Sequence, residues 1–250
     1  MSIIKALVAG NWKMNGLGVN LEEAKLLAAH LANDHFNCDV MLCPPSTLLA
    51  QAHWQLKGTK VALGGQDCHA AVSGAHTGDI SADMLKDGGA TAVIVGHSER
   101  RTNHKETDAQ VSAKAQAAHK SGLIAIICIG ETLEQRKSGK TLAVLTEQIK
   151  GSVPAGSTAA NSVVAYEPVW AIGTGLTPTV QEVHEAHAHI RAELGAAMGG
   201  EGASTRILYG GSVKPNNAAE LMGIENVNGA LVGGASLKAA DFMGIIKAYA

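Results

Sequence analysis

Aromatic residues, excess charge and long apolar runs are all scarce in this sequence. It has two Phe, three Trp and three Tyr among 250 residues, so the core cannot rest on large aromatic anchors. Lys and Arg number 20 against 22 Asp and Glu, which leaves no basic field to attract nucleic acid or an anionic membrane surface. The longest apolar run, Leu123–Ile129, is far shorter than the ~18 residues of a membrane-spanning helix. We therefore expect neither nucleic acid nor a membrane as a partner.

Cysteine pairs of the CxxC type are absent as well. The four cysteines are isolated from one another along the chain, at Cys38, Cys43, Cys68 and Cys128. Isolated cysteines in a chain of this size are typical of reduced thiols. The first residues carry Lys5 and lack the uninterrupted apolar core of a signal peptide. These features predict a cytoplasmic protein, with Cys128 as a small packing residue at a strand end.

Glycine, by contrast, is abundant, at 29 of 250 residues against a usual share of ~7%. Hydrophobic residues make up 46%, enough for a sizeable core. Many of the glycines directly follow short apolar runs, at Gly10, Gly64, Gly65, Gly96, Gly130, Gly210, Gly211, Gly233 and Gly234. This placement indicates tight turns where buried strands end.

Apolar runs and amphipathic stretches alternate about eight times along the chain. The runs, several of them β-branched, are typical of parallel strands covered on both faces; they span residues 6–9, 40–43, 61–63, 91–95, 123–129, 162–166, 207–209 and 230–232. The amphipathic stretches predict helices over 21–32, 108–121, 142–150 and 180–197. An open doubly wound sheet and a closed barrel both fit such repeats. Even spacing without a linker favours closure, so we predict the α/β class and one (β/α)8 TIM-barrel domain over residues 1–250, with eight parallel strands and outer helices.

Five motifs at these predicted strand ends carry chemical groups. They are GNWKMN at 10–15, GHSERR at 96–101, AYEPVWAIGTG at 165–175, YGGSV at 209–213 and LVGGAS at 231–236. In this order and at these strand ends, the motifs resemble the triosephosphate isomerase family over essentially the whole chain. The resemblance implies interconversion of dihydroxyacetone phosphate and glyceraldehyde 3-phosphate through an enediol(ate), with no metal or other cofactor. It also implies a homodimer.

The residues themselves support particular roles. An imidazole at a helix N-terminus, as expected for His97, is disfavoured as a cation and can donate a hydrogen bond to a carbonyl. The resemblance makes neutral His97 the electrophile and Glu167 the general base. It makes Lys13 the cation that stabilises the developing negative charge, with Asn11 and Glu99 orienting the lysine.

Two glycine-rich turns, at 210–212 and 233–235, can bring backbone N–H groups close to a phosphate, because a glycine has no Cβ and because each turn leads toward an expected helix. By resemblance the phosphate contacts are Gly173, Ser212, Leu231, Gly233 and Gly234. A lid is expected after Glu167, because Pro168 fixes the backbone and an apolar segment follows. The lid comprises Pro168, Val169, Trp170, Ala171, Ile172, Gly173, Thr174, Gly175, Leu176, Thr177 and Pro178.

The chain departs from the family pattern in its lid and its eighth strand. The family's equivalent of Tyr209 bonds a backbone N–H at the position of Pro178, which has none. We expect closure to rely instead on Gly173–Ser212 contacts and on a hinge stiffened by Pro178. Two family carboxylates are replaced by Asn226 and Asn228, so Arg191 is expected to need another partner. A family phenylalanine is Ala230.

The third loop also differs. The resemblance makes this loop the dimer contact, with Gln66, His76, Thr77 and Gly78 as its residues. His76 stands where the family usually has phenylalanine, which makes the interface a candidate for pH sensitivity.

Two alternatives stay open at this point. Another phosphate-binding (β/α)8 enzyme, such as a sugar-phosphate epimerase or a tryptophan-pathway barrel, would share the glycine turns. A non-catalytic barrel would share only the fold. A metal site on His184, His187 and His189 is not expected, since their spacing is not HExxH.

Overall fold

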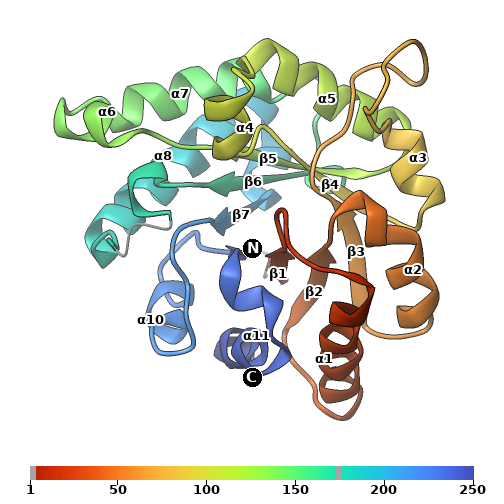
Figure 1. The fold of residues 1–250 in the computed structure, drawn as a ribbon. Coiled ribbons are helices and arrows are strands. Elements are labelled where there is room, and N and C mark those ends of the chain that lie inside the picture. Colours follow the sequence, from red (N-terminus) through yellow and green to blue (C-terminus); the bar gives the residue numbers. More distant parts are fainter. Residues whose placement is uncertain (1–3, 173–175) are drawn as a thin grey trace.

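The computed structural model describes residues 4–172 and 176–250, and its strands close into a parallel barrel in chain order (Figure 1). Closure is made by β1, which pairs with both β2 and β8. The strands are β1 (Ala6–Asn11), β2 (Cys38–Cys43), β3 (Val61–Gly65), β4 (Ala92–Val95), β5 (Ile124–Ile129), β6 (Ser162–Tyr166), β7 (Arg206–Tyr209) and β8 (Gly229–Val232). Every predicted strand is confirmed, with ends that differ by two residues at most.

Helices surround the barrel (Figure 1). The four predicted amphipathic stretches are helices in the structure, and shorter ones join them. The set is α1 (Leu21–Asn33), α2 (Ser46–Leu56), α3 (Ala82–Asp87), α4 (Ser98–Asn103), α5 (Asp108–Lys120), α6 (Leu133–Lys137), α7 (Thr141–Ser152), α8 (Val180–Met198), α9 (Gly200–Ser204), α10 (Ala218–Met222) and α11 (Ala239–Ile246). Short 3-10 turns are η1 (Gly18–Asn20), η2 (Val169–Ala171), η3 (Gly234–Leu237) and η4 (Lys247–Tyr249). Thr107, Thr132 and Thr179 start their helices with reciprocal capping boxes.

Alternate residues of each strand enter two different cores, because side chains of a strand point to opposite faces. The inner core is built from small and medium side chains: Leu7, Ala9, Met41, Cys43, Ala92, Ile94, Ile126, Cys128, Val163, Ala165, Leu208 and Leu231. The outward residues pack with the helices in a separate cluster. Burial on both faces explains the continuous apolar runs, and the narrow barrel explains why few aromatics are needed.

All four cysteines are buried and free, as the sequence predicts. Burial raises the pKa of the Cys43 thiol to about 12. Within residues 4–172 and 176–250, no helix combines the length and the apolar character needed to cross a membrane.

Gly130 shows how tightly the strand ends meet. A Cβ placed there would lie 1.7 Å from the carbonyl oxygen of Glu167. The close approach lets the Glu167 N–H donate to the Ile129 carbonyl at 2.7 Å. The ends of β5 and β6 are thereby locked together at the point from which the Glu167 side chain departs.

Candidate active site

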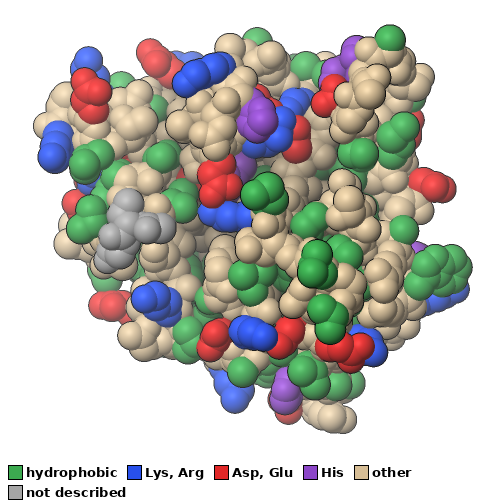
Figure 2. Space-filling model, viewed as in Figure 1, with side chains coloured by type: hydrophobic (Ala, Val, Ile, Leu, Met, Phe, Trp, Pro, Cys, Tyr) green, Lys and Arg blue, Asp and Glu red, His purple; other side chains and the backbone are tan. Residues whose placement is uncertain are grey.

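A cavity of about 430 Å³ opens at the carboxyl ends of the strands. Figure 2 shows an acidic and a basic side chain beside each other near the centre of this face. The cavity is lined by nine of the predicted catalytic and phosphate-binding residues: Asn11, Lys13, His97, Glu99, Glu167, Ser212, Leu231, Gly233 and Gly234. Residues from five of the barrel's strand ends therefore converge on one cavity.

Glu167 and His97 form a buried pair at the base of this cavity. His97 Nε2 lies 2.8 Å from Glu167 Oε1, and the Ser98 N–H donates to Glu167 Oε2 at 2.9 Å. His97 caps α4, where its Nδ1 accepts the Glu99 N–H at 3.2 Å. Because Nδ1 accepts, the neutral ring carries its proton on Nε2 and points it at the carboxylate.

Glu167 and His97 each shift the pKa of the other. Burial alone raises the pKa of Glu167, but His97, the Ser98 N–H and Lys13 together hold that pKa below its usual value. Burial lowers the pKa of His97, yet the neighbouring Glu167 carboxylate brings it above its usual value. The neutral His97 predicted from its helix N-terminus is therefore subject to a second influence, the Glu167 carboxylate, which raises the pKa of the imidazole.

Lys13 is held in a left-handed backbone conformation, with φ of 54°. Such a conformation costs a residue with a Cβ about 1–2 kcal/mol. Two side chains fix it: Asn11 Oδ1 accepts the Lys13 N–H at 3.0 Å, and Gln66 Nε2 donates to the Lys13 carbonyl at 2.9 Å. The Lys13 ammonium then lies 2.6 Å from Glu99 Oε1. Gln66, predicted as a dimer residue, thus holds an active-site backbone of its own chain.

The glycine turns differ from each other. After Gly233, η3 starts at Gly234, whereas after Ser212 the next helix, α10, begins only at Ala218. Both turns lead toward a helix, as predicted, but residues 213–217 separate the first turn from α10. In the first turn, a Cβ at Gly211 would lie 2.2 Å from the Tyr209 hydroxyl, so packing against that ring already requires glycine.

A buried carboxylate lies behind the first part of the predicted lid. Glu131 Oε1 accepts from Trp170 Nε1 at 2.9 Å, from Tyr166 at 3.2 Å and from Arg136 at 3.1 Å. The Glu131 side chain is fully buried. Sequence reasoning missed this residue, although a charged residue two positions after the buried strand β5 was a usable signal.

The middle of the predicted lid, residues 173–175, lies outside the described residues. Ser212 Oγ donates to the Ala171 carbonyl at 3.0 Å. Gly173, Thr174 and Gly175 lie outside the described residues, which leaves the expected Gly173–Ser212 contact untested. Pro178 is buried, and the buried Tyr209 hydroxyl has no partner among the described residues.

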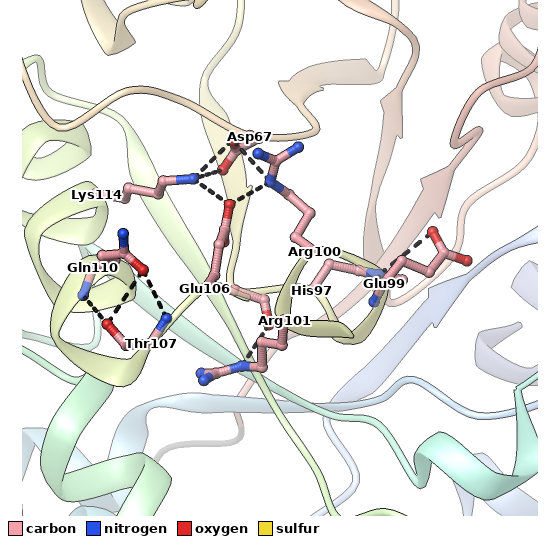
Figure 3. A network of polar contacts seen from close by, with 10 residues as sticks. Asp67, His97, Glu99, Arg100, Arg101, Glu106, Thr107, Gln110 and Lys114 are labelled. Atoms are coloured by element: carbon pink, nitrogen blue, oxygen red, sulfur yellow. Dashed lines mark hydrogen bonds and ion pairs between the residues drawn. The ribbon is translucent and has the colours of Figure 1, made fainter. Parts of the chain in front are cut away.

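An ion network holds α4, which carries His97 and Glu99 (Figure 3). Arg100 Nε lies 2.9 Å from Asp67 and 2.6 Å from Glu106, and Lys114 joins the same two carboxylates at 2.8 and 2.5 Å. Arg101 donates to the Gly96 carbonyl at 2.8 Å, next to His97. The sequence did not single out this network, because Asp67, which both cations contact, comes from the preceding βα unit.

Arg191 does not need a new partner, contrary to expectation. Arg191 hydrogen-bonds the residues at both replaced positions: Nε donates to Asn226 Oδ1 at 3.1 Å and Nη2 to Asn228 Oδ1 at 2.7 Å. An amide oxygen accepts a hydrogen bond as a carboxylate does. Two backbone carbonyls, of Gly202 and Thr205, complete the set at 2.7 and 2.6 Å.

The histidines of α8 have three different partners. His184 lies near Glu225, His189 bonds Thr146, and His187 bonds the Asn226 carbonyl. Burial lowers the pKa of His187 to about 4, so it is neutral near pH 7.

Taken together, the fold and cavity define a class of protein: a (β/α)8 enzyme whose cavity is lined by a buried carboxylate–imidazole pair and a lysine. A family model described as triosephosphate isomerase matches residues 6–249. The chain is similar to the triosephosphate isomerase of Chelativorans sp. (strain BNC1), with 62% identity over 98% of this chain and 97% of that one. It is 60% identical to the triosephosphate isomerase of Bradyrhizobium diazoefficiens, again over 98% and 97% of the two chains.

A solved structure agrees with these relatives. The crystal structure of triosephosphate isomerase from Bartonella henselae matches with a TM-score of 0.93 and 52% identity, over 98% of this chain and 99% of that chain. The chain belongs to the triosephosphate isomerase family. This membership decides against the other phosphate-binding barrels and the non-catalytic barrel considered from the sequence.

Proposed function

We propose that the protein interconverts dihydroxyacetone phosphate and D-glyceraldehyde 3-phosphate by moving a proton between two adjacent carbons. One observation carries the proposal: the Glu167 carboxylate, the His97 Nε2–H and the Lys13 ammonium all face one cavity. These are a base, a hydrogen-bond donor for a carbonyl and a cation for the oxygen that becomes negative. No metal or redox cofactor is part of this proposal.

In the structure the Glu167 carboxylate is engaged by neighbouring groups and is not free to contact a substrate. Its two oxygens are occupied by His97 and the Ser98 N–H, so it must leave both to reach a substrate carbon. Departure frees the His97 Nε2–H to donate to the substrate carbonyl. It also removes the main influence that raises the pKa of His97, while burial and Lys13 continue to lower it. Substrate binding therefore favours the neutral imidazole that the sequence predicted.

Charge that develops on the enediolate oxygen lies close to Lys13. The Lys13 ammonium is already oriented by Glu99 at 2.6 Å, and Asn11 holds its backbone. A positioned cation in a partly dehydrated cavity stabilises such charge more than water does. We assign Asn11, Lys13 and Glu99 to this role.

The phosphate is proposed to lie along Ser212, Leu231, Gly233 and Gly234, on the cavity wall formed after β7 and β8. Lys13 reaches this wall, since its Cε would lie 3.4 Å from a Cβ at Gly233. Gly173 and the lid, residues 168–178, would cover the bound substrate; Gly173 itself lies outside the described residues.

We also propose a cytoplasmic homodimer of single-domain chains. Beside the active site, a second cavity of about 390 Å³ is lined by Lys13, Met14, Gln66 and Glu99. Met14 at its rim is 96% exposed, which is unusual for an apolar side chain. This cavity can receive the loop of a second copy, which would bring Thr77 near Asn11 and Lys13. The buried free thiols fit a reducing compartment.

A coupled isomerase assay tests the function. We expect turnover in the wild type and its near loss in Glu167→Ala, with Glu225→Gln, an exposed glutamate, as the matched control. Wild-type inactivity would defeat the proposed reaction. Unchanged turnover in Glu167→Ala would defeat the base assignment alone.

A further inference from the structure

We propose that Lys214 attracts the dianionic phosphate of the substrate at the rim of the catalytic cavity and makes substrate capture depend on that charge. The inference rests on the proposed function and adds a residue that lies just beyond the YGGSV motif of 209–213. The Lys214 side chain is exposed, and it lines the cavity together with Lys13. Its segment joins β7 to α10 at the rim of the barrel (Figure 1).

The charges that line the cavity balance only because Lys214 is among them. Of the described residues, two lysines, Lys13 and Lys214, and two glutamates, Glu99 and Glu167, line this cavity. When His97 is neutral, these four charges cancel. Without Lys214 the lining would carry a net negative charge, which would repel an approaching dianion.

The two lysines differ in how their ammonium groups are engaged. The Lys13 ammonium is paired with Glu99 at 2.6 Å. Over residues 4–172 and 176–250, the Lys214 ammonium has neither an ion-pair partner nor a hydrogen-bond partner. The attraction of Lys13 for an anion outside the cavity is therefore offset by its neighbour, whereas no carboxylate offsets that of Lys214.

Hydrogen bonds fix the backbone from which the Lys214 side chain extends. The Lys214 N–H donates to Asn217 Oδ1 at 2.8 Å, and the Lys214 carbonyl accepts the Asn217 N–H at 3.1 Å. Asn217 Nδ2 donates to the Ser212 carbonyl at 3.2 Å, so one side chain ties Lys214 to the turn at 210–212. Pro215 packs on α11, where a Cβ at Gly244 would lie 2.7 Å from the Pro215 Cβ. The charge is thereby held beside the proposed phosphate position.

Exposure of the Lys214 side chain decides the stage at which it acts. An exposed charge pair contributes little to a bound complex and is screened by salt. A positive charge at the mouth of a cavity nevertheless raises the rate at which anions enter, because at 0.01 M ionic strength its attraction extends over about 30 Å. Lys214 therefore acts on the approach and first binding of the substrate, and not on the proton transfer assigned to Glu167 and His97.

Steady-state kinetics of Lys214→Gln at different ionic strengths tests this role. At about 0.01 M ionic strength we expect kcat/KM to fall about two- to fivefold through a higher KM, with kcat within about twofold of the wild type. At about 1 M, where the screening length is about 3 Å, the difference should vanish. Lys214→Arg keeps the charge and should keep the wild-type salt dependence. Lys120→Gln removes an equal, exposed charge at the end of α5, outside the cavity, and should match the wild type.

Calorimetric titration with inorganic phosphate adds a readout that does not require turnover. At equal ionic strength, phosphate should bind more weakly to Lys214→Gln than to Lys120→Gln. Equal kcat/KM and equal phosphate affinity in these two variants would overturn the proposal. So would a loss in Lys214→Gln that persists at high ionic strength or appears in kcat, since a changed shape of the turn would then be its cause. An inactive wild type that binds phosphate more tightly than Lys214→Gln does would defeat the isomerase function and still support the capture of phosphate.

Discussion

His97 Nε2 and Glu167 Oε1 lie 2.8 Å apart, and both residues are almost fully buried. Neither group can change its charge in this position without affecting the other. The pair therefore links the catalytic machinery to the pH dependence of folding.

The pair should stabilise the fold most strongly between the two ordinary pKa values. The lowered pKa of Glu167 contributes stability that is complete above its ordinary 4.5 and is lost as pH falls through the lowered value. The raised pKa of His97 contributes stability that is complete below its ordinary 6.5 and is lost as pH rises through the raised value. Urea unfolding across this range should show a maximum near pH 4.5–6.5 that is flatter in Glu167→Gln. An identical pH profile in the variant would contradict this coupling.

Glu131→Gln should destabilise the protein, because it leaves the half-buried Arg136 with one charged partner instead of two. Breaking a buried ion pair on one side costs about 3–5 kcal/mol, and the remaining Glu182 contact should keep the loss near the lower end. Chemical denaturation measures it. Glu134→Gln, an exposed neighbour on α6, should change the free energy of unfolding by less than ~0.5 kcal/mol.

Two glycine-to-alanine substitutions should act in opposite directions. Gly211→Ala places a methyl group against the Tyr209 hydroxyl, which should cost about 1–3 kcal/mol through overpacking. Gly195→Ala lies within α8 with open space around its Cβ and should stabilise by ~0.5–1 kcal/mol. Thermal unfolding of both variants checks the signs, and a stable Gly211→Ala would mean that Tyr209 moves freely.

Tyr209→Phe should leave turnover and stability within about twofold of the wild type. The hydroxyl is buried and has no partner in the described part of the chain, so its removal costs no hydrogen bond there. Steady-state kinetics and denaturation measure the two effects. Slowing on the order of a hundredfold, ~2.7 kcal/mol in the barrier, would show that the hydroxyl acquires a partner during catalysis.

The proposed dimer should weaken in acid. Histidine is the usual pH sensor of proteins, and His69 and His76 place two rings with centroids 3.9 Å apart in the contact loop, so positive charge on both would oppose the contact. Analytical ultracentrifugation should show more monomer at pH 5 than at pH 8, and His76→Phe should reduce the difference. A dimer equally tight at both values would rule out this sensitivity.

The barrel could be predicted because strands buried on both faces appear in the sequence as continuous apolar runs, such as the one in β5. Short helices such as α3 and α6 could not, since a pattern with a period of 3.6 is not legible over so few residues. The site residues were predicted from motifs that follow the strands. Their protonation was not, because the pKa of His97 depends on Glu167, which comes from a different βα unit. Glu131 was missed because its significance arises from contacts with Tyr166 and Trp170, which come from the next βα unit.

Arg191 and its amide partners have a consequence for the chemical lifetime of the chain. An asparagine followed by glycine is a weak point, because the next backbone nitrogen can attack the side-chain carbonyl and expel ammonia. Asn228 precedes Gly229, yet its Oδ1 accepts hydrogen bonds from Arg191 at 2.7 Å and from the Ile207 N–H at 3.0 Å. The attack requires that side chain to turn, and so it must wait until β7 and β8 part. The rate at which Asn228 loses ammonia is therefore set by how often the barrel opens between β7 and β8.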